Sequence, residues 1–315
     1  MITSFFKTSK PSHYIIFVLL LVSVFVFQRF DTYQTDALPV SYLKDISAFF
    51  VFFMALFLFV FINTKNNLTQ NNSFAAFYLC LFVLLLPKSL SNHSILLSNL
   101  FILLSFRRIF SLKTNTNVKR KLFDAGFWIA LASLFYPLTS LYFIPLLFTT
   151  IFLSSDVFKN IFTVFFGIIS VGLLTSLHNI ISYNEIKFLN KLLPNISLDF
   201  SAFNDVFLVL SAALLVTLVF WATFSLFNLM IFKASKTRFT FVMLFFALSL
   251  GILIPFLSPE KTEATFLFLL SPLSIVMANF TEHEKSLWTS NAIIVLIFAL
   301  ALTKIGFNIQ DLLNL

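Results

Sequence analysis

The chain has little charge, few glycines and almost no cysteine, and these shortages exclude several classes of protein. Only 11% of its 315 residues are charged, whereas soluble domains have about 25%. Together with a hydrophobic content of 59%, this excludes a soluble enzyme, a secreted disulfide scaffold and a disordered protein. The single cysteine, Cys80, lies in an apolar run, so we predict a small buried side chain without an intrachain disulfide.

Motifs that bind phosphate or metal are also missing. The five glycines, at positions 126, 167, 172, 251 and 306, make neither G-x-x-x-x-G-K nor G-x-G-x-x-G, so ATP-driven transport by this chain alone is not expected. The four histidines make no H-E-x-x-H. Glu282, His283 and Glu284 are adjacent, so on a helix their side chains would point to different faces. We predict no metal site and no cofactor.

Long hydrophobic runs are what the sequence does contain. It has 47 phenylalanines and a mean hydropathy of +0.96, more apolar side chain than a soluble interior can hold, so lipid must be the solvent for most of it. The runs are continuous, which predicts helices and not the alternating strands of a membrane β-barrel. The predicted spans are 14–28, 46–62, 73–87, 95–106, 122–137, 139–154, 161–177, 205–232, 239–257, 264–280 and 287–303.

The predicted fold class is therefore all-α, a polytopic integral membrane helical bundle of about 11 transmembrane helices. The range is 10–12, because 95–106 is short and Pro137 separates two closely spaced runs. The longest interval between spans, 178–204, has no room for a soluble domain, so we expect a single transmembrane domain over residues 1–315. The first run follows Lys7 and Lys10 as in a signal peptide, but no small-residue cleavage site follows it, which favours a retained helix.

The basic residues predict a cytoplasmic N-terminus. With alternating spans, 14 of the 21 lysines and arginines fall inside and 7 outside, as the positive-inside rule requires. The C-terminus then lies outside, after a short tail that begins at Lys304. The inside set is Lys7, Lys10, Lys65, Arg107, Arg108, Lys113, Lys119, Arg120, Lys121, Lys159, Lys233, Lys236, Arg238 and Lys285, and the outside set is Arg29, Lys44, Lys88, Lys187, Lys191, Lys261 and Lys304.

The middle of each predicted span lacks charge, which argues against a proton- or ion-coupled transporter. Polar residues within spans are expected to form hydrogen bonds between helices, and three internal prolines predict kinks. The polar residues are Ser98, Asn99, Ser105, Thr217, Ser225, Asn228 and Asn291, and the prolines are Pro145, Pro255 and Pro272.

One candidate catalytic group is the acidic external loop after the first span, with Asp31, Asp36 and Asp45. Membrane glycosyltransferases that use polyprenyl-linked sugars commonly place a carboxylate in this loop. There it acts as a general base for a sugar hydroxyl or holds a divalent cation. The alternative is an ordinary solvated loop, which has the same composition.

The second candidate is a basic rim on the predicted cytoplasmic side. Arginine pairs with phosphate oxygens in a bidentate manner, so such a rim suits anionic lipid headgroups or a lipid diphosphate. Asp124 is expected to form a structural pair with Arg107 or Arg108. The alternative is a topology signal without a specific ligand. The candidate headgroup-binding residues are Arg107, Arg108, Lys113, Lys119, Arg120 and Lys121.

Two segments resemble a family of Bacteroidota inner-membrane proteins that carries only a domain-of-unknown-function label. They are the opening Met1-Ile2-Thr3-Ser4-Phe5-Phe6-Lys7 and the block from Phe106-Arg107-Arg108 to Asp124-Ala125-Gly126-Phe127-Trp128 and on to Leu134. The resemblance covers most of the chain. It implies a multi-pass protein of the cell inner membrane and brings no activity or site with it.

The leading functional hypothesis is a component of cell-envelope biogenesis that handles lipid-linked sugars or polymers, like a glycosyltransferase or polymerase. The alternative is a non-enzymatic structural subunit of an envelope secretion or motility complex, and a lipid or solute transporter is third. A cavity open to the outer loops and to lipid would favour the first, and a flat apolar flank the second. The expected partners are membrane lipids, with a lipid-linked substrate or other inner-membrane proteins as further candidates, and no nucleic acid.

Overall fold

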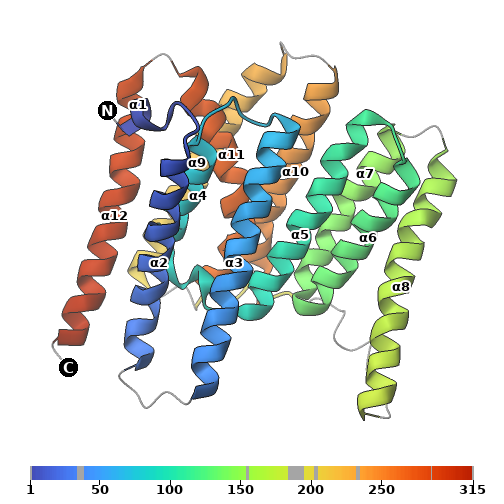
Figure 1. Cartoon of the computed structure of the whole chain (residues 1–315), viewed down its shortest axis with the longest axis horizontal. Helices are drawn as coiled ribbons and strands as arrows, with labels where there is room; N and C mark the ends of the chain where they lie inside the picture. Colours follow the sequence, from blue (N-terminus) through green and yellow to red (C-terminus); the bar gives the residue numbers. More distant parts are fainter. Residues whose placement is uncertain are drawn as a thin grey trace.

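A computed structural model describes residues 2–33, 39–153, 156–183, 195–201, 205–231, 235–284 and 286–313, and every regular element in these ranges is helical (Figure 1). The α-helices are α1 (Ile2–Phe6), α2 (Pro11–Tyr33), α3 (Pro39–Asn66), α4 (Phe74–Leu85), α5 (His93–Ser111), α6 (Val118–Phe135), α7 (Phe143–Leu153), α8 (Val157–Tyr183), α9 (Val206–Ile231), α10 (Ser235–Leu257), α11 (Leu267–His283) and α12 (Leu287–Leu313). The short 3₁₀ turns are η1 (Pro87–Leu90), η2 (Leu112–Thr114), η3 (Pro137–Tyr142) and η5 (Glu263–Phe266).

The helices from α2 to α12 follow one another in alternating directions, and the two ends of the chain lie at opposite ends of the bundle (Figure 1). Each of the predicted spans overlaps one of these helices. By length and composition, seven helices within the described residues are suited to cross a membrane, which indicates a membrane protein. They are α3, α5, α8, α9, α10, α11 and α12. A total of about 11 spans stays a prediction.

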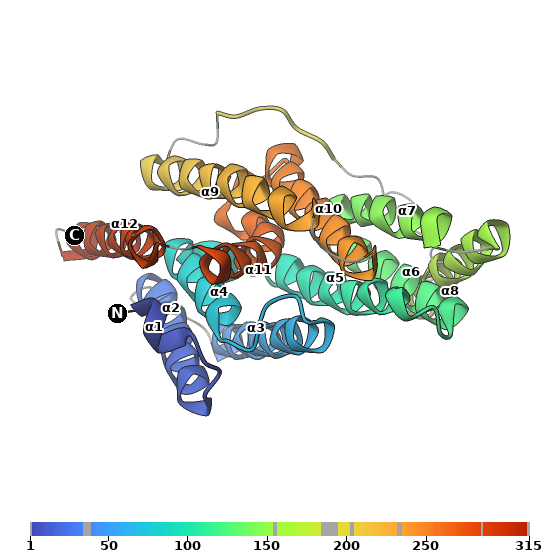
Figure 2. The same cartoon turned by 90° about the horizontal axis from the view of Figure 1, so that it is seen from above.

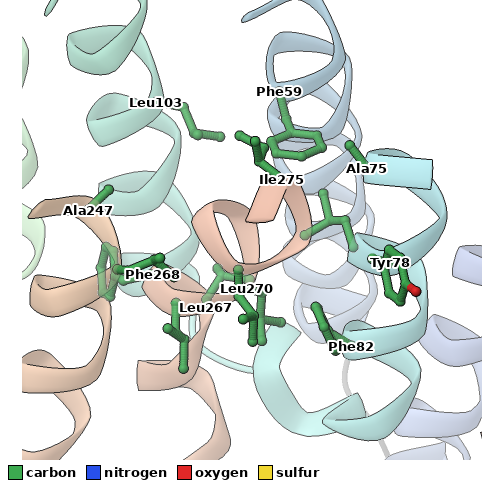
Figure 3. Packing of buried hydrophobic residues seen from close by; sticks show 14 of the residues in the cluster. Phe59, Ala75, Tyr78, Phe82, Leu103, Ala247, Leu267, Phe268, Leu270 and Ile275 are labelled. Atoms are coloured by element: carbon green, nitrogen blue, oxygen red, sulfur yellow. The ribbon is translucent and has the colours of Figure 1, made fainter. Parts of the chain in front are cut away.

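The centre of the fold is the pair α4 and α11. Every residue of α4 is buried, as is every residue of α11 from Leu267 to Thr281. Tyr78 and Thr281 share a 2.7 Å hydrogen bond between their hydroxyl groups, and Figure 3 shows Tyr78 and Phe82 of α4 beside Leu267 and Leu270 of α11. Seen from above, α2, α3, α5, α9, α10 and α12 lie around this pair, while α6, α7 and α8 lie to one side, beyond α5 (Figure 2).

Helix α4 can be shorter than a membrane span because other parts of the protein enclose it. Its 12 residues reach roughly 18 Å, well below the ~30 Å of a hydrocarbon core. A lipid-facing helix of that length would leave backbone groups at its end unsatisfied in hydrocarbon. Here the chain continues into η1, which packs against η5, so protein and not lipid covers the end of α4.

Two serine hydroxyls fix the antiparallel register of α5 and α6. Ser98 donates to the Ala132 carbonyl over 3.0 Å, and Ser105 donates to the Ala125 carbonyl over 3.2 Å. The donors are seven residues apart on α5 and the acceptors are seven apart on α6. Seven residues are about two helical turns, so both hydrogen bonds join the same face of α5 to the same face of α6. These bonds confirm the interhelical role predicted for Ser98 and Ser105. The Thr217 hydroxyl instead bonds a carbonyl of its own helix, that of Leu214.

Glycines allow α6 and α8 to approach closely. A Cβ atom on Gly167 would lie 2.7 Å from the Phe123 carbonyl oxygen and 2.9 Å from the Phe127 nitrogen. A Cβ on Gly126 would lie 3.0 Å from the Val164 oxygen. Small residues at such crossings are the usual basis of helix association in lipid, because apolar side chains gain little there by leaving the solvent.

The structure corrects several predicted boundaries. The helices α2 and α3 extend to Tyr33 and from Pro39, so most of the predicted external loop 29–45 is helix. Helix α5 runs over 19 residues, where only 95–106 was predicted, because the Asn92 side chain accepts hydrogen bonds from two backbone N–H groups and caps its start. Lys304 lies inside α12 and not in a tail. Pro255 and Pro272 lie inside continuous helices.

The glycine contacts generate a matched pair of substitutions. Gly167→Ala forces a methyl group against the α6 backbone and is expected to lower the free energy of unfolding by about 1–3 kcal/mol. Gly306→Ala is the control, because nothing lies within 4 Å of its added Cβ. Thermal unfolding in detergent measures both. Equal midpoints for the two variants would contradict a close α6–α8 crossing.

Candidate functional site

Seven cations gather at the end of the bundle where the chain begins, and we call them the basic end. They come from α3, α5, η2 and α6, and all except Lys65 were predicted from the sequence as basic residues that bind headgroups. The basic end consists of Lys65, Arg107, Arg108, Lys113, Lys119, Arg120 and Lys121.

The α5–α6 register brings Arg108 opposite Asp124. The Nη2 atom of Arg108 lies 2.8 Å from Oδ2 of Asp124, and the two side chains are 38% and 32% exposed. With that much solvent, the ion pair contributes no more than about 1 kcal/mol. Its main effect is that Arg108 already has an anionic partner. Arg107, the neighbouring arginine, has no such partner among the described residues and can bind an external anion.

Arg107 and Lys65 share one aromatic ring. The guanidinium carbon of Arg107 and the ammonium of Lys65 each lie 5.2 Å from the centre of the Phe61 ring, which is cation–π distance. Lys65 and Phe61 are one turn apart on α3, and Arg107 reaches them from α5. Neither cation pairs with a carboxylate within the described ranges. Two positive charges are therefore held close together without neutralisation.

Lys113 and Lys121 are occupied inside the protein. The Lys113 ammonium donates to the Asn66 carbonyl over 3.1 Å. The Lys121 ammonium donates to the Ser111 carbonyl over 2.6 Å and to the Thr114 hydroxyl over 2.9 Å. Both satisfy carbonyls at helix C-termini, which have no partner within the helix. Burial, reinforced by the charges of Arg108 and Lys65, lowers the pKa of Lys121.

Lys119 and Arg120 are exposed and line a separate polar recess of about 400 Å³ between the starts of α6 and α8. We call this the α6–α8 recess, and its lining is Asn115, Asn117, Val118, Lys119, Arg120, Asp156 and Asn160. The predicted basic rim is thus divided into three parts: the Lys65–Arg107 pair, the internally bonded lysines and the recess.

A buried ion pair at the opposite end escaped sequence analysis. The Nζ atom of Lys304 lies 2.6 Å from Oε1 of Glu263, and their side chains are only 3% and 4% exposed. The other Glu263 oxygen accepts the Lys88 backbone N–H over 2.9 Å. The sequence could have indicated that Lys304 is buried. It continues the helical spacing of Ile294, Ile297 and Ala301, which form the buried face of α12.

Lys261 at the same end is buried as well. Its ammonium donates to the carbonyls of Ser197 and Phe256 and lies 4.8 Å from the centre of the Phe200 ring. Burial lowers its pKa. The side chain ties the segment 195–201 to the end of α10, a structural task that the sequence did not reveal.

The predicted catalytic carboxylates lie in or near the α2–α3 connection. Asp31 belongs to the last turns of α2 and Asp45 to the first turns of α3, but their side chains are outside the described part of the structure. Asp36 lies outside the described residues altogether. Among the residues that the structure describes, no group of three or more His, Cys, Asp or Glu side chains is arranged to hold a metal ion.

Comparison with known proteins places the chain in a family. Residues 8–312 match the model of a family of unknown function (DUF6427), and the chain belongs to that family. No curated protein and no solved structure matches it. The family brings no activity, so function has to be argued from the side chains.

The buried pair predicts a characteristic set of stabilities. Lys304→Met leaves the Glu263 carboxylate buried without its cation and is expected to cost about 3–5 kcal/mol of unfolding free energy. Replacing both residues by methionine removes the uncompensated charge, so the double variant should recover most of that loss. Unfolding in detergent measures the three variants. A double variant as unstable as Lys304→Met would contradict a pairing role.

Proposed function

We propose that this protein is a multi-pass protein of the cell inner membrane that binds phosphate headgroups at its basic end and handles lipid-linked sugars or polymers in cell-envelope biogenesis. Its proposed topology is about eleven spans with a cytoplasmic N-terminus, and its proposed partners are membrane lipids and no nucleic acid. The observation that carries the proposal is the pair Arg107 and Lys65, held over Phe61 without a carboxylate among the described residues.

Unneutralised cations at the ends of apolar helices lie at headgroup depth. Each lysine or arginine there contributes about 1 kcal/mol to attraction toward an anionic lipid surface. Arg107 adds a planar donor set that matches phosphate oxygens. Because Phe61 holds both charges in place, less side-chain entropy is lost when a headgroup binds.

The proposed orientation gains support from the way the opposite end treats its cations. Of the basic side chains described there, Lys261 and Lys304 are buried against internal partners, and Lys88 is exposed. Two of the three basic side chains described at that end are therefore held inside the protein. An excess of free positive charge on one side is what the positive-inside rule associates with the cytoplasm.

The enzymatic version of the proposal requires Asp31, Asp36 or Asp45 to act on a lipid-linked sugar at the opposite end. Its starting premise, a long external loop, has become a short connection between two helices, 34–38. The non-enzymatic alternative, a subunit of an envelope assembly, draws support from the flank of α8. Four phenylalanines are exposed there: Phe158, Phe162, Phe165 and Phe166.

The third function, a transporter, draws no support from the cavity at the centre of the bundle. A cavity between α3, α5, α10 and α11 is lined mainly by apolar side chains, with Asn99 and Ser271 as polar members. Its volume of about 30 Å³ has space for a water molecule and not for a lipid or an organic solute.

The headgroup proposal is tested by lipid binding. Replacing Lys65 and Arg107 together by glutamine should weaken association with phosphatidylglycerol by about 2 kcal/mol, or roughly thirtyfold, and reduce its salt dependence. Lys88→Gln, an exposed lysine at the opposite end, is the control. Native mass spectrometry with phosphatidylglycerol and phosphatidylcholine in competition measures the change. Equal retention of phosphatidylglycerol by both variants would contradict the proposal.

The topology is tested with reporter fusions. A reporter joined after Lys121 should report the cytoplasm, and one after Leu315 the periplasm, because the two positions lie at opposite ends of an odd series of helices. A reporter that works only in the cytoplasm and one that works only in the periplasm give complementary signals. Both junctions on the same side would remove the eleven-span model.

A further inference from the structure

We propose that the α6–α8 recess is a binding site for a zwitterionic lipid headgroup that carries a phosphate and a primary amine, as phosphatidylethanolamine does. The inference rests on the proposed membrane placement but not on Lys65 and Arg107, which lie elsewhere in the basic end. It therefore describes a second lipid site with a different chemistry.

The recess carries both charges that such a headgroup requires. Lys119 and Arg120 of the first turn of α6 supply exposed cations, and Asp156, directly before α8, supplies a carboxylate. Asp156 forms only a long and exposed ion pair inside the described structure, with Lys159. Its contact with Lys159 is 3.9 Å, beyond hydrogen-bond distance, and the side chains are 58% and 71% exposed. Asp156 reduces the attraction of Lys119 and Arg120 for a simple anion, whereas a phosphate joined to an ammonium satisfies both sets of groups.

A buried polar side chain in the lining also indicates a ligand. Asn160 is only 5% exposed, and the structure shows no hydrogen bond from its carboxamide to any described residue. Because Asn160 lines the recess, its carboxamide is available there to a ligand. It offers donors to a phosphate oxygen and an acceptor to an ammonium.

The position of the recess favours a lipid over a soluble molecule. Helix α8 is the outermost helix on its side of the bundle (Figure 1), and the recess lies at its start. Directly after it come Phe158 and Phe162, which are 81% and 63% exposed. A headgroup in the recess would leave its hydrocarbon chains along this apolar flank. The volume of about 400 Å³ accommodates a phosphoethanolamine group.

The test is calorimetric titration of the full chain in detergent with three probes: dihexanoyl phosphatidylethanolamine, dihexanoyl phosphatidylglycerol and free phosphoethanolamine. With Lys65 and Arg107 replaced by glutamine, which removes the other proposed headgroup site, the protein should bind the first most tightly. It should bind free phosphoethanolamine more weakly, because that probe lacks chains; equal affinity would identify the ligand as a soluble phosphoamine. In that variant, binding of phosphatidylglycerol equal to or tighter than that of phosphatidylethanolamine would overturn the proposal.

The variants separate the two charges. In the Lys65→Gln, Arg107→Gln background, replacing Lys119 and Arg120 by glutamine should weaken the binding of both lipids at least tenfold. Asp156→Asn should weaken phosphatidylethanolamine about fivefold and strengthen phosphatidylglycerol by a similar factor, since one charge near a surface is worth about that much. These side chains are exposed, so folding is not expected to change, and an unaltered unfolding midpoint in each variant checks this.

The variant Arg107→Gln distinguishes this site from the basic-end pair. It should leave phosphatidylethanolamine affinity unchanged. If Arg107→Gln abolishes that binding and the recess variants do not, the headgroup binds at the basic-end pair, and the recess proposal is wrong while the proposed function stands. If Asp156→Asn leaves phosphatidylethanolamine affinity equal or higher, the amine is not recognised and the proposal is also wrong.

Discussion

The register between α5 and α6 is the constraint on which the rest of the basic end depends. In lipid, apolar side chains gain little by meeting each other, so small side chains and hydrogen bonds decide where two helices touch. The hydroxyls of Ser98 and Ser105 bind two alanine carbonyls of α6 and exclude neighbouring registers. The same register stacks Phe101 on Trp128, with ring centres 5.7 Å apart, and brings Arg108 to Asp124. The opposite edge of α6 then receives α8 through Gly126 and Gly167.

An ion pair is buried at one end of the bundle, whereas several cations at the other end have no carboxylate partner among the described residues. The physical reason is the free-energy cost of removing an ion from water. Glu263 and Lys304 are almost completely buried, and at that depth a charge persists only with a partner in direct contact. Lys65, Arg107, Lys119 and Arg120 lie where water and headgroups are available, so they need no internal partner. The Glu263–Lys304 pair is therefore structural, while Lys65 and Arg107 have no carboxylate partner among the described residues.

The proposed headgroup binding depends on which cations have no partner inside the protein. Seven basic residues lie close together in the basic end, but Lys113 and Lys121 bind carbonyl oxygens and Arg108 binds Asp124. The remaining cations fall into two places with distinct surroundings, an aromatic ring at Phe61 and a polar recess beside Asp156. The first suits a simple anionic headgroup, and the second suits a headgroup with both charges.

The sequence by itself determined the solvent of this protein, the positions of its helices and the end at which basic residues gather. These properties follow from hydropathy and charge counted along the chain, which act locally. It also indicated Ser98 and Ser105 as interhelical donors and Asp124 as a partner of Arg107 or Arg108. The tertiary structure decided which arginine forms that pair, that Lys304 turns inward to Glu263, and that Lys119 and Arg120 face α8. Those outcomes depend on helix rotation and register, which are set by contacts between residues far apart in the chain, such as Gly167 with Phe123 and Lys304 with Glu263.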